Sequence, residues 1–238
     1  MIVTDHFVYI HVSRTGGTFL NRLILSQFPD ARMLQYHGHL ENLPSVYSNL
    51  PVIGFVRNPW DWYVSMFNDY RRKPQYVFRT LSNGGQLDFS DTVTRFLNLG
   101  DGSMESQELL RQLIEMAPET IDPGQTVGKN LPGINKKHFA SYPTDLGYYS
   151  WLFELMFRSK AKQHIHYGYF ENLREDALRI FEEIGVKITK SIIAYLKLEP
   201  SANKSARPEE YSDIYGIELR ELLAMREQAL IERFGYEF

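Results

Sequence analysis

The chain has 238 residues, of which 43% are hydrophobic and 23% charged, a composition typical of a globular protein with a sizeable core. It contains no cysteine, which excludes disulfides, thiolate nucleophiles and cysteine-bound metals. The formal net charge of −3 argues against a nucleic-acid partner, but it does not exclude a local basic pocket. No segment has the pattern of a membrane span or a signal peptide, so we expect a cytoplasmic protein.

The first part of the chain alternates strands with helices. Residues 7–12 form a continuous apolar run that is typical of a central parallel strand, and a glycine-containing loop and a helix follow it. A short strand is predicted over 33–36 and a buried strand over 51–56. Asn58 and Pro59 then favour the start of a helix that continues to about residue 70.

The rest of the chain is irregular at first and then regains this alternation. Residues 71–150 contain many Gly and Pro turn signals, with one helix expected within 103–116. We interpret 71–150 as a variable insertion near the acceptor site, within a single domain of residues 1–238. The later predicted elements are a helix over 148–157, a strand over 165–170 and helices over 174–184 and 218–234. Such alternation predicts the α/β class, with a short central parallel sheet flanked by helices.

The loop after the first strand carries the features of a phosphate-binding site. Gly16 and Gly17 let the main chain approach an anion at a helix N-terminus, where N–H groups lack partners and the helix dipole is positive. Thr15 and Thr18 add hydroxyl groups, and Arg14 adds a fixed charge. The alternative is a tight turn whose glycines only relieve strain. An ATP- or GTP-cleaving loop ends in Gly-Lys-Ser/Thr, and no Lys follows Gly17 here.

Two motifs together resemble the sulfotransferases, which use 3′-phosphoadenosine-5′-phosphosulfate (PAPS) and release adenosine 3′,5′-bisphosphate (PAP). Residues 11–18, His-Val-Ser-Arg-Thr-Gly-Gly-Thr, resemble the family's 5′-phosphosulfate-binding loop. Arg57 and Ser65 match its second mark, an arginine leaving a strand and a serine eight residues later on the next helix. A surface ion pair for Arg57 and a backbone-bonded serine for Ser65 are the structural alternatives.

The resemblance implies a P-loop-type three-layer fold and a division of roles. Arg14 and the segment from Thr15 and Gly16 through Phe19 would hold the 5′-phosphosulfate, and Arg57 with Ser65 the 3′-phosphate. No metal is implied. The usual family lysine is replaced by Arg14, which keeps its proton at accessible pH, so its expected role is electrostatic.

A histidine pair supplies the candidate base. The segment His37-Gly38-His39 resembles that of uronyl 2-O-sulfotransferases, which implies His39 as the first and His37 as the second candidate to take the acceptor proton. Histidines that only cap a strand end are the alternative, and Glu41 is the nearest acidic rival. A His-X-His pair can bind Zn²⁺, but no third ligand has suitable spacing, so no metal site is expected.

The C-terminal region completes the prediction. Lys204 and Arg207 would fold over the nucleotide phosphates, or else belong to a solvated basic stretch. The predicted function is transfer of a sulfuryl group from PAPS to an acceptor hydroxyl, with a saccharide favoured. Tyr148, Tyr149 and Trp151 are candidates to stack on that sugar. The alternatives are a nucleotide-binding protein without transfer activity and a nucleotide kinase. Acceptor identity and oligomeric state stay open.

Overall fold

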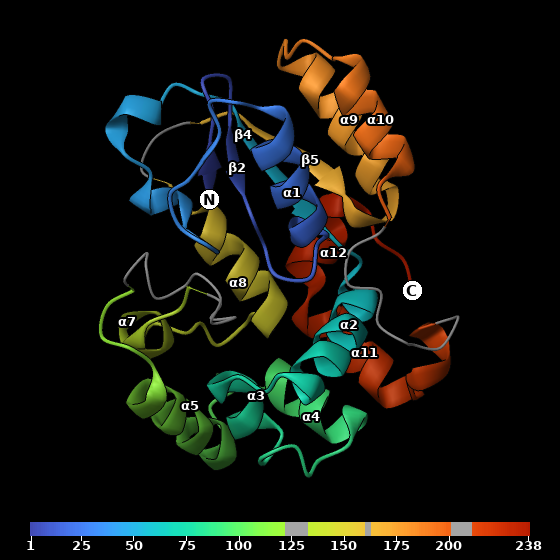
Figure 1. Ribbon diagram of the computed structural model, residues 1–238. Helices are drawn as coiled ribbons and strands as arrows, with labels where there is room; N and C mark the ends of the chain where they lie inside the picture. The colour runs from blue at the N-terminus through green and yellow to red at the C-terminus, as the bar shows by residue number, and fades with distance from the viewer. Residues whose placement is uncertain (122–132, 160–162, 201–210) are drawn as a thin grey trace. The chain divides into compact units, whose positions relative to one another are not determined.

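The computed structural model describes residues 1–121, 133–159, 163–200 and 211–238 (Figure 1). These fall into two compact units. The first takes its described residues from 1–57, 123–133 and 155–204, and the second from 58–122, 134–154 and 205–238. The division at residue 57 falls directly after a strand. A single domain with an insertion at 71–150 stays a prediction.

A five-stranded mixed sheet forms the centre of the first unit. In spatial order it runs β3 (Arg32–Met33), β1 (Ile2–Val3), β2 (Val8–Ile10), β4 (Val52–Val56) and β5 (Ile165–Tyr169). The strands β2, β4 and β5 are parallel, whereas β1 runs antiparallel to both β2 and β3. The α/β class and its short parallel sheet are therefore confirmed.

The antiparallel strand β1 is an addition that the sequence pattern did not indicate. Thr4 makes the hairpin between β1 and β2, because its hydroxyl oxygen accepts from the N–H groups of His6 and Phe7 at 3.1 and 2.9 Å. The strand expected over 33–36 is shorter than predicted and pairs with β1 over Arg32–Met33.

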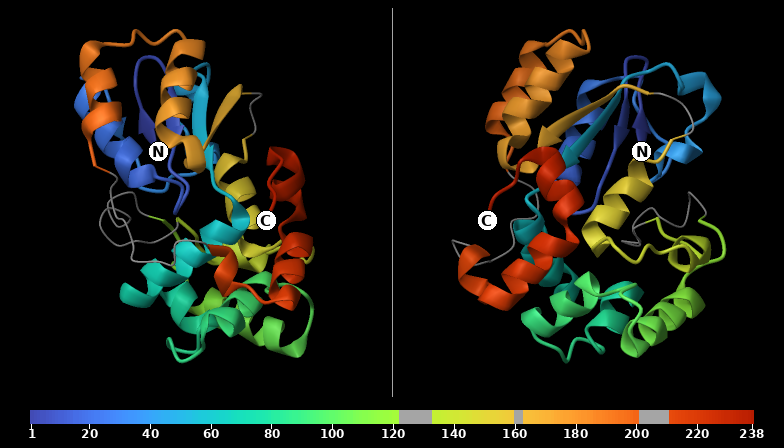
Figure 2. Two further views of the ribbon diagram at one scale, coloured as in Figure 1. Left: turned by 90° about the vertical axis from the view of Figure 1, so that its right-hand side faces the viewer. Right: turned by 180° about the vertical axis from the view of Figure 1, so that it is seen from behind.

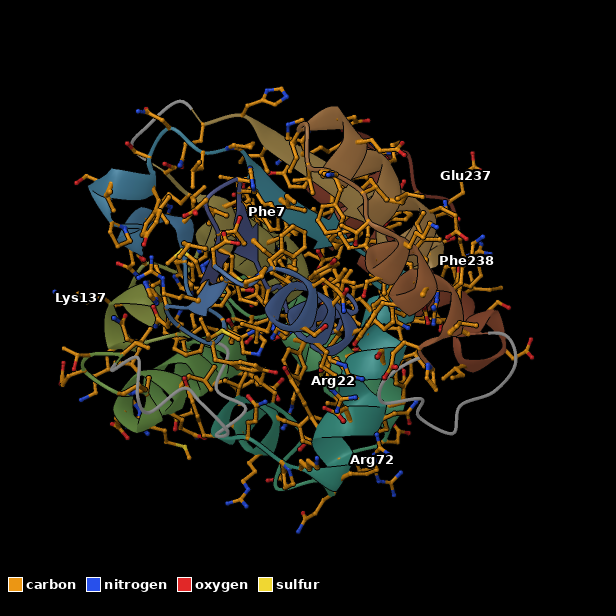
Figure 3. The ribbon with its side chains drawn as sticks, turned by 45° about the horizontal axis from the view of Figure 1, so that its top comes forward. Phe7, Arg22, Arg72, Lys137, Glu237 and Phe238 are labelled. Carbon is orange, nitrogen blue, oxygen red and sulfur yellow. The ribbon has the colours of Figure 1, made fainter. Side chains whose placement is uncertain are left out.

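Three helices cover one face of this sheet, α1 (Gly17–Gln27), α9 (Leu173–Glu183) and α10 (Lys190–Leu198), as Figure 2 shows in its left view. Alternate strand residues point toward them and are fully buried. Phe7 lies at the centre of this layer (Figure 3), with its ring 5.2 Å from Phe28 and 5.5 Å from Phe181. Burying each such ring stabilises the fold by about 2–3 kcal/mol.

The opposite face of the sheet is contacted by the end of α8 (Tyr148–Phe157). A Cβ on Gly54 would lie 2.2 Å from Cζ of Phe157, so only glycine lets this ring reach the middle of β4. The first unit is thus a sheet with three helices on one face and the last turn of α8, from residue 155, on the other.

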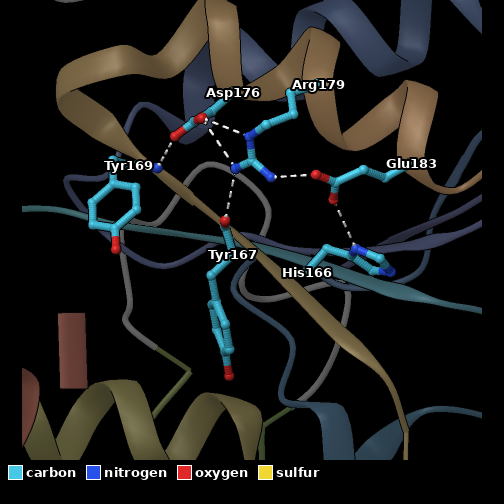
Figure 4. Close-up of polar contacts among 6 residues, drawn as sticks. All are labelled: His166, Tyr167, Tyr169, Asp176, Arg179 and Glu183. Carbon is cyan, nitrogen blue, oxygen red and sulfur yellow. Dashed lines mark hydrogen bonds and ion pairs between the residues drawn. The ribbon is translucent and has the colours of Figure 1, made fainter.

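The edge strand β5 is fastened to α9 by side chains of that helix (Figure 4). The Asp176 carboxylate accepts from the N–H of Tyr169 at 2.7 Å, and Arg179 donates to the carbonyl of Tyr167 at 3.2 Å. Arg179 also pairs with Asp176 at 3.0 Å and with Glu183 at 2.7 Å. Outward-facing backbone groups of an edge strand are thereby occupied within the molecule, which removes a template for pairing with another chain.

The second unit is helical. Its helices are α2 (Pro59–Arg72), α3 (Tyr76–Leu81), α4 (Phe89–Leu97), α5 (Met104–Met116), α7 (Lys136–Ala140), α11 (Ile217–Arg226) and α12 (Gln228–Phe234), with the start of α8. The predicted start of α2 is confirmed, because the Asn58 side chain accepts from the N–H of Trp60 at 3.0 Å. None of the helices that the structure describes is both long and apolar enough to cross a bilayer.

The single helix expected over 218–234 is wrong. The chain breaks between α11 and α12, where Arg226 and Glu227 both turn into the unit. The Arg226 guanidinium donates to the carbonyls of Leu97 at 2.6 Å and Thr144 at 3.0 Å. Burying two charged groups side by side needs a local change of direction, which amphipathic periodicity alone does not reveal.

The buried Glu227 carboxylate caps the N-terminus of α8, although it lies 77 or more residues away along the chain. It accepts from the N–H groups of Tyr149 and Ser150 at 3.1 and 2.7 Å, in the first turn of that helix, and from the Tyr63 hydroxyl at 2.6 Å. A Cβ on Gly147, which precedes the helix, would lie 2.2 Å from Glu227 Oε1. Burial raises the pKa of Glu227, while these hydrogen bonds oppose the rise.

Glu227→Ala is expected to lower the free energy of unfolding by about 3–5 kcal/mol, because several buried donors lose the carboxylate that they share as acceptor. Urea denaturation followed by circular dichroism measures this loss. Glu232→Ala, at an exposed position of the same helix, is the control and should change stability by less than about 0.5 kcal/mol. Comparable losses in the two variants would contradict the capping role.

Candidate functional site

The loop between β2 and α1 ends in a glycine that opens the helix. Gly16 has φ 81° and ψ 8°, a left-handed conformation, and no side chain caps α1. Its carbonyl accepts from the N–H groups of Phe19 and Leu20 at 3.0 and 3.2 Å. A Cβ on Gly16 would lie 2.7 Å from Leu173. Both the left-handed backbone and this close contact therefore require glycine at the position. A helix N-terminus of this kind directs backbone N–H groups at an anion.

Arg14 holds a strained backbone within the same loop. Its φ of 66° lies in the left-handed region, which a residue with a Cβ enters at a cost of about 1 kcal/mol. The neighbouring Thr15 is fully buried and donates its hydroxyl to the carbonyl of Val12 at 2.9 Å. The Thr15 hydroxyl therefore stabilises the loop through a buried hydrogen bond. The backbone strain lies at Arg14, the residue that is predicted to supply the positive charge.

Arg57 connects the second motif to this loop. It follows β4 directly and donates from its guanidinium to the Arg14 carbonyl at 2.9 Å. The guanidinium also lies 4.0 Å from the ring centroid of Phe170, and only 4% of the residue is exposed. Two arginines thus meet at the carboxyl ends of the adjacent parallel strands β2 and β4, where α/β proteins bind their ligands.

The other predicted nucleotide-binding residues are less closely associated. The Phe19 side chain belongs to the hydrophobic core, with its ring 4.7 Å from the Arg174 guanidinium carbon. Ser65 is buried on α2, in the second unit, and its pairing with Arg57 stays a prediction. Lys204 and Arg207 lie outside the described residues.

His37 is held by the backbone that leads into the loop. Its Nδ1 lies 2.9 Å from the carbonyl oxygen of His11, and because a carbonyl can only accept, Nδ1 carries the proton. Burial lowers the pKa of His37 to about 4, against the hydrogen bond to His11, which raises it. Neutral His37 therefore has its lone pair on Nε2. Its φ of 51° is left-handed, as at Arg14.

His39 is buried beside the same segment. A Cβ on Gly133 would lie 2.4 Å from the His37 carbonyl oxygen and 3.1 Å from His39 Nε2, so the chain at Gly133 comes close to both. The acidic rival Glu41 is exposed, one residue into the short 3₁₀ helix η1 (Leu40–Asn42). Burial distinguishes the two histidines from the exposed Glu41, and imidazole is the most frequent general base in enzymes.

His11, the first residue of the motif at 11–18, was not among the candidate site residues predicted from the sequence. It accepts from His37 through its backbone and from the Asn21 amide through Nδ1, the latter at 3.1 Å. Phe170, which contacts Arg57, was likewise missed. These partners lie far apart along the chain or on different elements, so no spacing rule would have found them.

The aromatic residues proposed to stack on a sugar belong to the core of the second unit. Tyr148, Tyr149 and Trp151 are each at most 3% exposed. The Tyr149 ring stacks on Trp62 at 4.4 Å, and Trp151 lies 4.6 Å from the Tyr142 ring. The stacking prediction is wrong for these three residues, because an aromatic-rich helix pattern does not distinguish a binding surface from a core face.

Similarity of this chain to known proteins is found in structure and not in sequence. No family model matches the sequence, and no curated protein matches it. Among solved structures, the crystal structure of mouse sulfotransferase SULT7A1 complexed with PAP aligns over 98% of this chain and 88% of that chain, at 14% sequence identity and a TM-score of 0.45.

His37 is expected to make the protein less stable in acid. Its pKa in the folded state, about 4, lies below the ordinary value of 6.5, so the unfolded chain takes up the proton first as pH falls. Stability present above pH 6.5 is therefore lost on acidification toward pH 4. Between pH 7 and pH 5 this group should cost about 2 kcal/mol.

His37→Asn removes this titration, while asparagine tolerates a left-handed backbone and can donate to the His11 carbonyl. Urea unfolding at both pH values should show a loss about 2 kcal/mol smaller than in the wild type. His6→Asn, at an exposed position, serves as the control. An unchanged pH dependence in His37→Asn would show that His37 is not held neutral.

Proposed function

We propose that this protein is a PAPS-dependent sulfotransferase that transfers a sulfuryl group to an acceptor hydroxyl. The observation that carries the proposal is the hydrogen bond from the Arg57 guanidinium to the Arg14 carbonyl. It joins the two sequence motifs that the family resemblance assigns to the two ends of one nucleotide. A turn that only relieved strain would need neither the left-handed Arg14 nor the buried Arg57.

The donor groups of this region suit a doubly anionic ligand. Arg14 and Arg57 supply permanent positive charge, and the start of α1 supplies backbone N–H groups without a side-chain cap. When bound, PAPS supplies an activated sulfuryl group. Arg14 would act by stabilising the negative charge that develops on the departing phosphate oxygen, since arginine does not give up a proton. We propose no metal for this step.

We assign the acceptor proton to the histidine pair. His37 is neutral with Nδ1 tied to a carbonyl, so its Nε2 is the atom able to take a proton. The family resemblance ranks His39 first as the base. The contact of His37 with the His11 carbonyl leads us to rank His37 first and His39 second. A hydroxyl of a carbohydrate is the favoured acceptor, on the resemblance of the His-Gly-His segment.

Nucleotide preference tests the proposal most directly. Isothermal titration calorimetry should show that PAP binds more tightly than AMP. A separate ATP turnover assay should show no Mg²⁺-dependent consumption of ATP. Arg57→Ala should weaken PAP binding by about 2–4 kcal/mol, because a buried charge-assisted contact is lost. Arg22→Ala, on the exposed side of α1 (Figure 3), is the matched control and should bind PAP as the wild type does.

Equal affinities for PAP and AMP would refute the sulfotransferase proposal. Mg²⁺-dependent hydrolysis or transfer from ATP would favour a nucleotide kinase instead. Tight binding of PAP without transfer to any hydroxyl would identify a nucleotide-binding protein that has no transferase activity.

The base is tested by turnover of a labelled sulfate donor against a panel of hydroxyl acceptors. His37→Asn should slow transfer by roughly 10²–10⁴-fold and leave the Kd for PAP unchanged. A base must be unprotonated, so kcat/KM of the wild type should stay level on acidification until pH approaches about 4. Normal turnover in His37→Asn together with loss in His39→Asn would move the role to His39.

A further inference from the structure

His11 lies between the phosphate loop and His37 and contacts both. It follows β2 directly and is fully enclosed, with 5% of its surface exposed. Its imidazole packs against Gly17, where an added Cβ would lie 1.8 Å from His11 Cδ2 and 1.9 Å from Nε2. Its backbone carbonyl accepts the Nδ1 proton of His37 at 2.9 Å.

The His11 ring is fixed on one face of α1. The Asn21 amide donates to its Nδ1 at 3.1 Å, and Gly17 and Asn21 are four residues apart on the same side of the helix. Burial lowers the pKa of His11 well below its ordinary value, with smaller contributions from His37 and Arg14, so the ring is neutral in this position. The neutral ring is thus held against the start of α1 by packing and one hydrogen bond.

His37 depends on this arrangement for its tautomer. Its left-handed backbone is unfavourable for a residue with a Cβ, and its ring lies 4.3 Å from that of His11. The ring of Tyr36 lies 4.5 Å away on the same loop. If the His11 carbonyl turned aside, Nδ1 would lose its acceptor and the proton would be free to move to Nε2.

We infer that His11 is a positioning residue that couples the phosphate loop to His37. The His11 ring packs against Gly17, so its position depends on the start of α1. The His11 carbonyl keeps the His37 proton on Nδ1, so that Nε2 of His37 can accept the acceptor's proton. The catalytic consequence rests on the proposed function, whereas the structural coupling does not.

Gly17→Ala tests the coupling at its contact. Gly17 does not have a left-handed backbone, so alanine suits the helix start and its cost comes from the His11 ring. We expect the ring to be displaced and His37 to show protonation at Nε2 in long-range ¹H–¹⁵N imidazole spectra. The wild type should show His37 protonated at Nδ1. The Kd for PAP should rise by roughly 10-fold or more.

A second substitution should rescue the first. His11→Ala removes all the ring atoms that meet the added methyl group, Cγ included. Gly17→Ala made in the His11→Ala background should then change the Kd for PAP by less than about 3-fold relative to His11→Ala alone. Gly216→Ala is the matched control, because nothing lies within 4 Å of its added Cβ, and it should leave the His37 spectrum unchanged.

Two results would overturn the inference: an unaltered His37 spectrum in folded Gly17→Ala, or an equal effect of Gly17→Ala in both backgrounds. If Gly17→Ala alone does not fold, recovery of folding in the double variant supports the contact and failure to recover refutes it. A wild type that binds no PAP would refute the proposed function, while the His37 spectra would still decide whether His11 positions His37.

Discussion

The hydrogen bond from the buried Arg57 guanidinium to the Arg14 carbonyl is the constraint on which the candidate site depends. Arg14 has an unfavourable left-handed backbone, and such a conformation persists only where the surroundings hold it. Arg57 supplies that support from the adjacent parallel strand, and the Phe170 ring in turn supports Arg57. Contacts within the protein therefore fix the shape of the loop.

Each unit uses a buried polar residue to join elements that are distant in the chain. In the first unit His11 links α1 to the segment that carries His37, and in the second Glu227 receives the first turn of α8. Buried polar groups stabilise a fold only when their hydrogen bonds are satisfied, so each of them specifies one arrangement of its neighbours. Apolar packing tolerates small shifts that such directional contacts do not.

Periodicity and turn chemistry predicted most of the elements, because these depend on neighbours in sequence. The helix beginning at Pro59 and the strand β4 were predicted within two residues of their bounds. The break at Glu227 was missed, since a charged residue in an amphipathic pattern is normally assigned to the solvent. A sequence pattern likewise does not distinguish a buried aromatic residue from one on a binding surface. Tyr149 was therefore predicted to stack on a sugar, whereas its ring is buried against Trp62.

The sequence by itself determined the α/β class, the glycine-containing loop at a helix start and the residue types that could bind phosphate, because each follows from local backbone and charge. The tertiary structure alone decided that Arg57 bonds to Arg14 and that the proton of His37 sits on Nδ1. The first depends on β2 and β4 lying side by side, and the second on the segment at His37 lying against the end of β2. Contacts between residues tens of positions apart leave no periodic trace in a single chain.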